Sequence, residues 1–306
     1  GGVKASLYDE NLRTLSRSFI EYETFYPKPH LHEQRPADWW EGITKSTHQL
    51  LKKTGTLASE IKAVALSGHS CVAVPLDEKK NVLLRQVPIW SDTRAVKEAD
   101  DFFTRINYTD WYATTGNGFP PSCYVLFKLM WYKKNMPDLF RQIHLVLGSK
   151  DYVNFLLTGN TYTDYSYASS SGAYDLLNKR FDSHFMKAAG IPEDISPSIV
   201  SSHNQIGTVT EQAAKETGLA QGTIVACGGV DNACMALGAI GSEAGNIYTS
   251  LGSSSWVPVN SDAPILDPVR RPYVFAHIEE NMFTSAFSIF AGGSSFRWIR
   301  ETLCRD

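Results

Sequence analysis

The most informative segment of this chain is IVACGGVDNAC, residues 224–234. Its apolar run ends in two glycines and the carboxylate Asp231, which is typical of a strand that places an acid at the start of a helix. Glycine also lets a ligand come close to the backbone. Either Asp231 does chemistry at this strand end, or it or Asn232 serves only to cap the helix that follows.

The composition is that of an ordinary globular protein. Of the 306 residues, 43% are hydrophobic and 20% are charged, enough to bury one large core or two smaller ones. The formal net charge is -3, the pI is about 6.3, and the Lys and Arg residues are scattered. A nucleic acid partner is therefore not expected, and a small neutral or anionic ligand fits the charge better than a polymer.

The cysteines and the apolar windows indicate a compartment. The five cysteines are widely spaced and form no Cys-x-x-Cys pair, which predicts buried thiols in a reducing environment rather than disulfides or a zinc site. The most apolar long window, residues 224–240, is interrupted by glycines, Asp231 and Asn232, so we expect no membrane span and no membrane partner. No signal peptide precedes Gly1, which predicts a cytoplasmic protein.

Hydrophobic periodicity predicts an α/β fold. Strands are predicted after the glycine turn at residues 1–2 and over residues 61–67, 72–77, 86–90, 224–227, 246–251, 256–259 and 282–290. Helices are predicted over residues 36–53, 93–105, 126–135, 150–157, 181–189, 210–218 and 233–237 and from residue 294 onward, with loops over 116–121 and 158–173. Residues 72–77 and 86–90 flank a short turn, so the sheet is expected to be mixed. A domain rarely begins inside a glycine turn, so a strand is expected before Gly1.

A series of short motifs runs along the whole chain. In order, they are Gly1-Gly2-Val3-Lys4-Ala5, Pro36-Ala37-Asp38-Trp39-Trp40, Trp90-Ser91-Asp92-Thr93-Arg94, Lys150-Asp151-Tyr152, Leu157-Thr158-Gly159, Thr163-Asp164-Tyr165-Ser166, Gly228-Gly229-Val230-Asp231-Asn232, Ser250-Leu251-Gly252-Ser253-Ser254 and Ala291-Gly292-Gly293. Together they resemble the carbohydrate kinase family named after its Phe-Gly-Gly-Tyr motif, which contains xylulokinase, gluconate kinase and glycerol kinase. The resemblance implies a ribonuclease H-like, actin-like ATPase fold: a mixed sheet with flanking helices, a sugar-binding domain over residues 1–244 and the start of a nucleotide-binding domain over residues 245–306.

The same resemblance implies ATP-dependent phosphorylation of a small sugar, sugar acid or polyol, with ATP and Mg²⁺ as cofactors. A sugar hydroxyl that attacks the γ-phosphate must lose its proton, and a carboxylate at a rigid strand end can accept it. The family pattern makes Asp231 this general base and Asn232 a substrate contact. A homodimer is expected only by analogy with the family.

The substrate side departs from relatives that can be named. At the recognition loop, where xylulokinases carry Met-His and glycerol kinases Arg-Glu, this chain has Gly68-His69-Ser70-Cys71. His69 and Ser70 are candidates to hydrogen-bond sugar hydroxyls, Trp90 to cover a sugar C–H face, and Asp92 to accept a hydrogen bond. A packing role explains His69 and Trp90 nearly as well. The sugar itself cannot be named from this loop.

The nucleotide side is only partly represented. The resemblance assigns Gly1, Gly2, Lys4, Gly252, Ser253, Ser254 and Gly293 to cofactor binding, and places Trp256 near substrate. Small residues in such loops let backbone N–H groups reach phosphate oxygens, although a serine-rich turn and an amphipathic surface helix are the alternatives. The family's opening Asp-x-Gly-Thr segment and its adenosine loop lie outside the chain, so the isolated chain is expected to be inactive.

Two other classes of protein remain open. A sugar-binding or regulatory protein could keep this fold without turnover. An actin-like ATPase acting on protein partners would share the phosphate loops, but it would not need the Trp-Ser-Asp-Thr-Arg and Thr-Asp-Tyr-Ser segments together. Helix 126–135, which carries Lys128, is read as structural.

Overall fold

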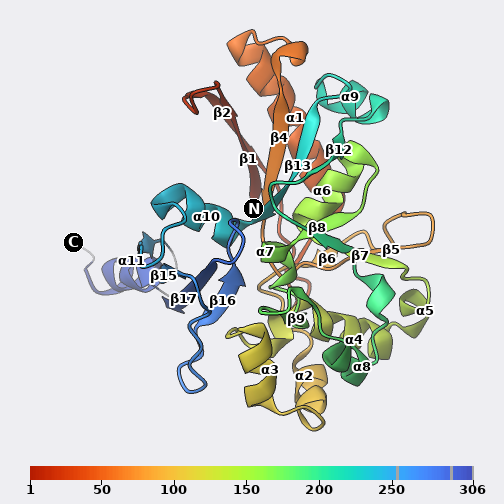
Figure 1. Ribbon diagram of the computed structural model, residues 1–306, viewed down its shortest axis with the longest axis vertical. Helices are drawn as coiled ribbons and strands as arrows, with labels where there is room; N and C mark the ends of the chain where they lie inside the picture. The colour runs from red at the N-terminus through yellow and green to blue at the C-terminus, as the bar shows by residue number, and fades with distance from the viewer. Residues whose placement is uncertain (253–254, 290–291, 305–306) are drawn as a thin grey trace.

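The computed structural model describes residues 1–252, 255–289 and 292–304. Its central sheet is mixed, because β13 (Ile224–Val230) pairs in parallel with β4 (Ala63–Gly68) and antiparallel with β12 (Gln205–Thr208) (Figure 1). The hairpin of β1 (Gly2–Tyr8) and β2 (Thr14–Glu21) lies beside this sheet. Among the described residues the hairpin forms a separate two-stranded sheet. The predicted mixed sheet is confirmed.

Helix α1 (Pro36–Thr54) follows from local sequence signals. Pro36 occupies its first position, Asp38 lies in its first turn and two lysines lie in its last turn, where each charge suits the helix dipole. The helix ends at Gly55, which has a left-handed φ of 69°. The helix packs on the hairpin, where Gly42 lies against Val3 and Ile20, and its buried Trp39 joins the core cluster that contains Val225 of β13. Local charge and apolar spacing therefore place this helix correctly.

The remaining helices cover the sheet and build the lower part of the molecule in Figure 1. Helix α6 (Ser149–Thr158) packs on β13 and β4. The others are α2 (Val96–Phe103), α3 (Tyr108–Thr115), α4 (Val125–Asn135), α5 (Pro137–Phe140), α7 (Tyr165–Ala168), α8 (Ser183–Ala189), α9 (Glu211–Thr217) and α10 (Asp231–Ile240). Edge-to-face rings of Phe102, Trp111 and Phe127 form the centre of the lower core.

Short strand pairs connect these layers. They are β3 (Glu33–Gln34) with β6 (Val87–Pro88), β5 (Val74–Leu76) with β7 (Leu145–Leu147), β8 (Tyr162–Asp164) with β11 (Ser198–Val200), and β9 (Tyr174–Asp175) with β10 (Arg180–Phe181). The strands predicted over 72–77 and 86–90 exist, but each pairs with a distant partner. The predicted loop over 158–173 is wrong in part, because β8 and α7 lie within it.

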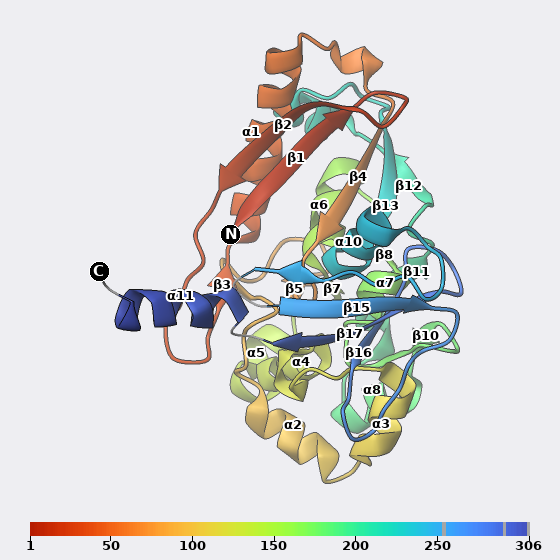
Figure 2. The same cartoon turned by 90° about the vertical axis from the view of Figure 1, so that its left-hand side faces the viewer.

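The last part of the chain forms an antiparallel sheet in the order β14-β15-β17-β16, followed by α11 (Gly292–Leu303). The strands are β14 (Ser250–Leu251), β15 (Ser255–Ser261), β16 (Tyr273–Ala276) and β17 (Phe283–Ile289). Figure 2 shows this sheet at mid-height, below the β1–β2 hairpin and above α2. Tyr273 and Phe275 share one core cluster with Val230 and Ala233. The domain boundary at residue 244 stays a prediction, and core packing crosses it.

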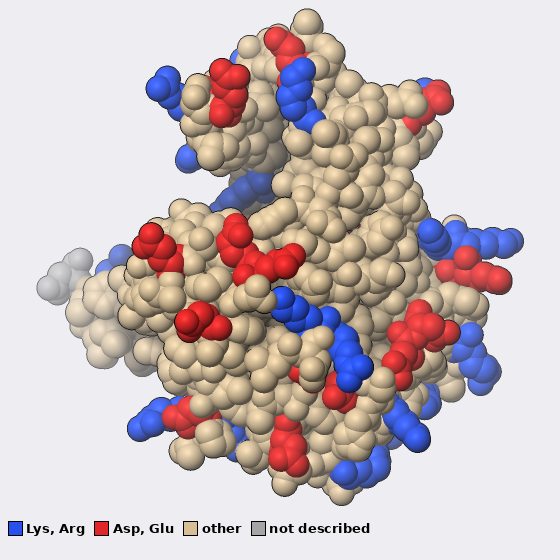
Figure 3. All heavy atoms as spheres, viewed as in Figure 1, with Lys and Arg blue, Asp and Glu red and all other residues tan. Residues whose placement is uncertain are grey.

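The surface carries charges of both signs. On the face shown in Figure 3, Lys and Arg side chains are interspersed with Asp and Glu. A hollow opens on this face between the β1–β2 hairpin and α10. Across the described ranges, the helices lack the combination of length and apolar character that a membrane crossing requires.

Candidate active site

A bulge in β13 sets the direction of the strand end. Its register against β4 shifts between Ala226 and Gly229. Gly228 has a φ of 69°, and a Cβ there would lie 1.9 Å from the carbonyl oxygen of Leu66. A Cβ on Gly229 would lie 2.2 Å from Cδ1 of Ile278. Gly228 is therefore required by its left-handed φ and by the neighbouring backbone, whereas Gly229 leaves room for the Ile278 side chain where the strand turns into α10.

Asp231 is the first residue of α10, and Val230 is its N-cap residue, with extended φ and ψ of -64° and 145°. Neither Asp231 nor Asn232 therefore occupies the N-cap position that the alternative assigned to them. Asp231 Oδ1 accepts a hydrogen bond from the Asn232 N–H at 2.9 Å. Burial raises the pKa of Asp231 to about 6, against the opposite effect of that N–H. At neutral pH the group is an ionised carboxylate that binds a proton more readily than an exposed aspartate.

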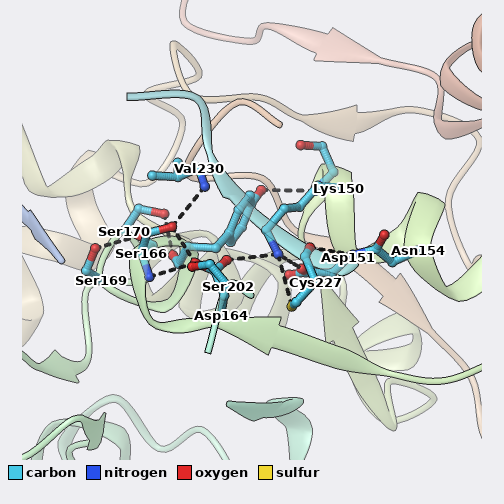
Figure 4. Close-up of polar contacts among 12 residues, drawn as sticks. Lys150, Asp151, Asn154, Asp164, Ser166, Ser169, Ser170, Ser202, Cys227 and Val230 are labelled. Atoms are coloured by element: carbon cyan, nitrogen blue, oxygen red, sulfur yellow. Dashed lines mark hydrogen bonds and ion pairs between the residues drawn. The ribbon is translucent and has the colours of Figure 1, made fainter. Parts of the chain in front are cut away.

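A buried hydrogen-bond network holds the backbone directly before this acid (Figure 4). The Val230 N–H donates to Ser166 Oγ at 2.9 Å. The Ser166 hydroxyl in turn donates to Asp164 Oδ2, which also accepts the Ser202 hydroxyl at 2.8 Å. These serines and Asp164 are buried. The last residue of β13 is thereby linked to a side-chain cluster rather than to solvent.

Lys150 supplies the positive charge of that cluster. Its Nζ lies 2.5 Å from Asp151 Oδ1 and 2.9 Å from Asp164 Oδ1 (Figure 4). Burial opposes the charged lysine, but the two carboxylates outweigh it and raise the pKa of Lys150. The motifs around residues 150 and 164 were recognised in the sequence without a role for these side chains. The available signal was a pair of charges within an otherwise buried helix face.

A cavity of about 280 Å³ lies beside the predicted recognition loop. Its walls are formed by Ser70, Cys71, Trp90, Ser91, Thr93, Phe119, Pro120 and Cys123. Two of the predicted substrate residues, Ser70 and Trp90, are thus brought together. Burial raises the pKa of the Cys71 thiol to about 12, and the charge of Asp231 adds to the rise.

Lys128 holds the backbone of this wall through two hydrogen bonds. Its ammonium group is fully buried and donates to the carbonyl oxygens of Cys71 and Ile89, both at 2.7 Å. Cys71 is in the wall and Ile89 immediately precedes Trp90. The helix was read from the sequence as structural, and the structure shows which two segments it fixes.

Two other predicted substrate residues do not line the cavity. The His69 ring packs edge-on against Trp39 at 5.7 Å between centroids, and burial lowers its pKa to about 4, which keeps it neutral. Asp92 is fully buried, where it accepts from Arg94 Nε at 2.8 Å and from the His32 N–H at 2.7 Å. In this conformation Asp92 is committed to protein partners rather than to a ligand.

Near α10, Trp256 lies in β15 with its ring edge-on to Tyr248 at 5.7 Å. Burial, with a further contribution from the charge of Asp231, raises the pKa of the Tyr248 phenol. The ring pair is therefore on the Asp231 side of the molecule. Asn232 is partly buried in the first turn of α10.

The predicted phosphate residues are brought together only in part. The Gly293 N–H donates to the Gly252 carbonyl at 3.0 Å, so two segments far apart in the sequence meet. Gly1, Gly2 and Lys4 lie on the separate β1–β2 hairpin. A Cβ on Gly2 would lie 2.2 Å from the Phe19 ring, so packing alone accounts for that glycine. The predicted residues Ser253 and Ser254 lie outside the described residues.

The chain is similar in sequence to a known family of proteins. Residues 1–238 match the FGGY family of carbohydrate kinases, N-terminal domain, and the chain therefore belongs to this family. It is 28% identical over 300 residues to a xylulose kinase of Bacillus subtilis (strain 168), covering 98% of this chain and 60% of the relative. An autoinducer-2 kinase of Yersinia pseudotuberculosis is 27% identical over 319 residues, which cover all of this chain and 58% of the relative.

A solved structure agrees with the fold. The xylulose kinase from Rhodospirillum rubrum superimposes with a TM-score of 0.92 at 28% identity, over 99% of this chain and 61% of that one. The predicted actin-like ATPase type of fold is confirmed, and the structure covers its first domain. The chain spans about 60% of the length of the relatives it matches.

The cofactors implied by the family fit this chain unequally. Gly252 and Gly293 meet where a phosphate loop is expected, but the Gly293 N–H is donated to the Gly252 carbonyl in this structure. For Mg²⁺, the described residues contain no group of three His, Cys, Asp or Glu side chains placed to hold a metal ion. Asp231 alone does not constitute a magnesium site.

Proposed function

We propose that the whole protein containing this chain phosphorylates a small sugar, sugar acid or polyol with ATP, and that Asp231 is the general base. The observation that carries the proposal is the partly buried Asp231 carboxylate, with its pKa near 6, whose charge acts on Cys71 in the wall of a small cavity, in a chain of the FGGY family. Relatives named for xylulose and autoinducer-2 kinases support a small polyhydroxylated acceptor.

The proposed step is a single displacement. ATP supplies the phosphoryl group when it is bound. A substrate hydroxyl loses its proton to a carboxylate oxygen of Asp231 while its oxygen forms a bond to the γ-phosphorus and the bond from that phosphorus to ADP breaks. The bulge at Gly228 and Gly229 and the link from Val230 to Ser166 keep the carboxylate in position.

Substitution of Asp231 tests this role in the whole protein. Asp231→Ala should lower kcat by roughly 10²- to 10⁴-fold, the usual contribution of a general base, and should leave the sugar dissociation constant measured by calorimetry nearly unchanged. The acid limb of the wild-type kcat/KM profile should lie near pH 6. Asp262→Ala, at an exposed position, is the control. Unchanged turnover by Asp231→Ala would refute the assignment.

The same assays separate the alternative class. A sugar-binding or regulatory protein would bind a sugar in calorimetry but show no ADP formation with any acceptor in a panel of ketoses, alditols and aldonates. We further propose that residues 1–306 alone do not turn over ATP, because phosphoryl transfer needs nucleotide and acceptor positioned together. Normal ATP-dependent turnover by this polypeptide in a coupled assay would overturn that second proposal.

A further inference from the structure

We propose that the cavity lined by Cys71 and Cys123 accommodates an apolar end of the substrate, so that the preferred acceptor is a deoxy sugar or deoxy polyol, with these two cysteines as specificity-determining residues. The inference rests on the proposed function and names its substrate class. The reacting hydroxyl would lie at Asp231, and a methyl or methylene carbon at the other end would face the cysteines.

The exposed part of the cavity wall is mainly carbon and sulfur. Trp90, Phe119 and Pro120 contribute rings, and Cys71 and Cys123 contribute thiols. The Phe119 ring stacks on Tyr273 at 4.1 Å with an interplanar angle of 14°, which gives the wall a fixed apolar surface. Thiols behave as small apolar groups with weak hydrogen-bonding capacity.

Both thiols are neutral in this setting. Burial raises the pKa of Cys71 to about 12 and also raises the pKa of Cys123. Neither cysteine therefore presents an anion that would attract a hydroxyl proton. A thiol is also a much weaker partner for a sugar hydroxyl than the carboxylate, amide or imidazole groups that polyol sites use.

The hydroxyl groups in the wall already have protein partners. Ser91 Oγ is 2.8 Å from His32 Nδ1, and Thr93 Oγ1 is 3.2 Å from His30 Nδ1. The Ser70 hydroxyl is hydrogen-bonded to the Cys71 thiol. A sugar hydroxyl that entered this space would lose its hydrogen bonds to water and find no equivalent partners in the wall. A methyl group makes no such hydrogen bonds and would lose none.

The Asp92 carboxylate, which lies in the segment that forms this wall, is bound by Arg94 and does not face the cavity. Asp92 lies between Ser91 and Thr93 in sequence, but Arg94 binds its Oδ1 through Nε and its Oδ2 through Nη2, each at 2.8 Å. The side chain of Asp92 is fully buried. The strongest potential acceptor near the cavity is thus neutralised by an adjacent residue, which leaves an apolar site of small volume.

Pairs of acceptors that differ by one hydroxyl test the inference with the whole protein. Each pair is a ketose and its analogue deoxygenated at the carbon most distant from the phosphorylated one. We expect kcat/KM to be roughly 10- to 100-fold higher for the deoxy member, the range that one small apolar group supplies in a hydrophobic pocket. Equal or higher kcat/KM for the hydroxylated member overturns the inference and leaves the kinase proposal intact. Absence of turnover with every member of the panel would instead count against the kinase proposal.

Isosteric cysteine variants test whether Cys71 and Cys123 cause the preference for deoxy acceptors. Cys71→Ser and Cys123→Ser each place a hydroxyl in the wall and should reduce the deoxy preference by roughly 10-fold. Cys304→Ser, at an exposed position outside the cavity, should retain the wild-type ratio. Thermal melting checks that the variants fold, and Cys71→Ala and Cys123→Ala, which add no polar group, should keep the preference. An unchanged ratio in folded Cys→Ser variants would refute the role of the cysteines.

Discussion

Lys150 and Lys128 are both fully buried near the site, but their charges are compensated in opposite ways. Lys150 is paired with Asp151 and Asp164, which outweigh burial and raise its pKa. Lys128 donates to the carbonyl oxygens of Cys71 and Ile89, and burial lowers its pKa. The base is thus supported by an ionic cluster, and the cavity by a lysine bound to neutral groups. One side of the site is therefore held by paired charges, and the other by hydrogen bonds from a lysine to the backbone.

The largest expected effect is a loss of folding stability when Lys150 is substituted. Lys150→Met leaves the carboxylates of Asp151 and Asp164 buried without their cation, and loss of one partner from a buried pair costs about 3–5 kcal/mol. The free energy of unfolding in urea measures this. Lys215→Met, which removes an exposed lysine paired with Glu211, should have little effect. A loss below about 1 kcal/mol for Lys150→Met would show that the cluster is not the main support of the base.

The next effect concerns Asp231, whose pKa rises on folding from 3.8 to about 6. Between these values the folded protein holds a proton that the unfolded chain has released, so stability falls as pH rises through this window and stays lower above it. Asp231→Asn removes the ionised form, and the unfolding free energy should rise by up to about 3 kcal/mol at pH 7.5. Near pH 3.5 the variant should match the wild type. An equal gain at both pH values would contradict the assigned pKa.

A smaller effect is expected on the cavity side. Lys128→Met removes its own desolvated charge and leaves two carbonyl groups short of a donor, which costs about 1–3 kcal/mol. Because those carbonyls adjoin cavity residues, KM for the sugar in the whole protein should rise roughly 10-fold, with a smaller change in kcat. If kcat fell while KM stayed constant, Lys128 would act by positioning Asp231 rather than by supporting the cavity wall.

The smallest effect isolates one hydrogen bond. Ser166→Ala removes the acceptor of the Val230 N–H, and displacement of Asp231 should lower kcat in the whole protein roughly 10-fold without changing sugar affinity. Ser202→Ala removes a donor to the same oxygen of Asp164 but leaves the Val230 contact intact. It should keep near wild-type kcat. Equal losses in both variants would mean that Ser166 acts only through Asp164.

Much of the fold follows from local pattern. The α1 helix and the strand before Asp231 lie within a few residues of their predicted ranges, because apolar spacing, end charges and glycines are local signals. Strand β16 was missed because all four of its residues are buried, which erases the alternation expected of a half-buried strand. Strand partners, such as β5 with β7, depend on distant segments and carry no local signal.

The site likewise has features that a local motif predicts and others that depend on distant residues. Asp231 and its strand end follow from a local motif, and their catalytic role stays a prediction. The orientation of Asp92 was missed, although Arg94 two residues later was a usable sign that the carboxylate has a protein partner. The supporting contacts of Lys150 and Lys128 join residues far apart in the chain. Residue type indicates chemistry, but only the packed structure shows which groups are already occupied.

The core shared by Val230, Ala233, Tyr273 and Phe275 bears on where this polypeptide can be divided. The family's N-terminal domain match ends at residue 238, yet β16 lies beyond that point and buries its side chains against α7 and α10. Cleavage between residues 241 and 272 would leave those apolar side chains without their partners. The core around the base therefore includes side chains from beyond the end of the N-terminal domain match, and the two parts are expected to unfold together.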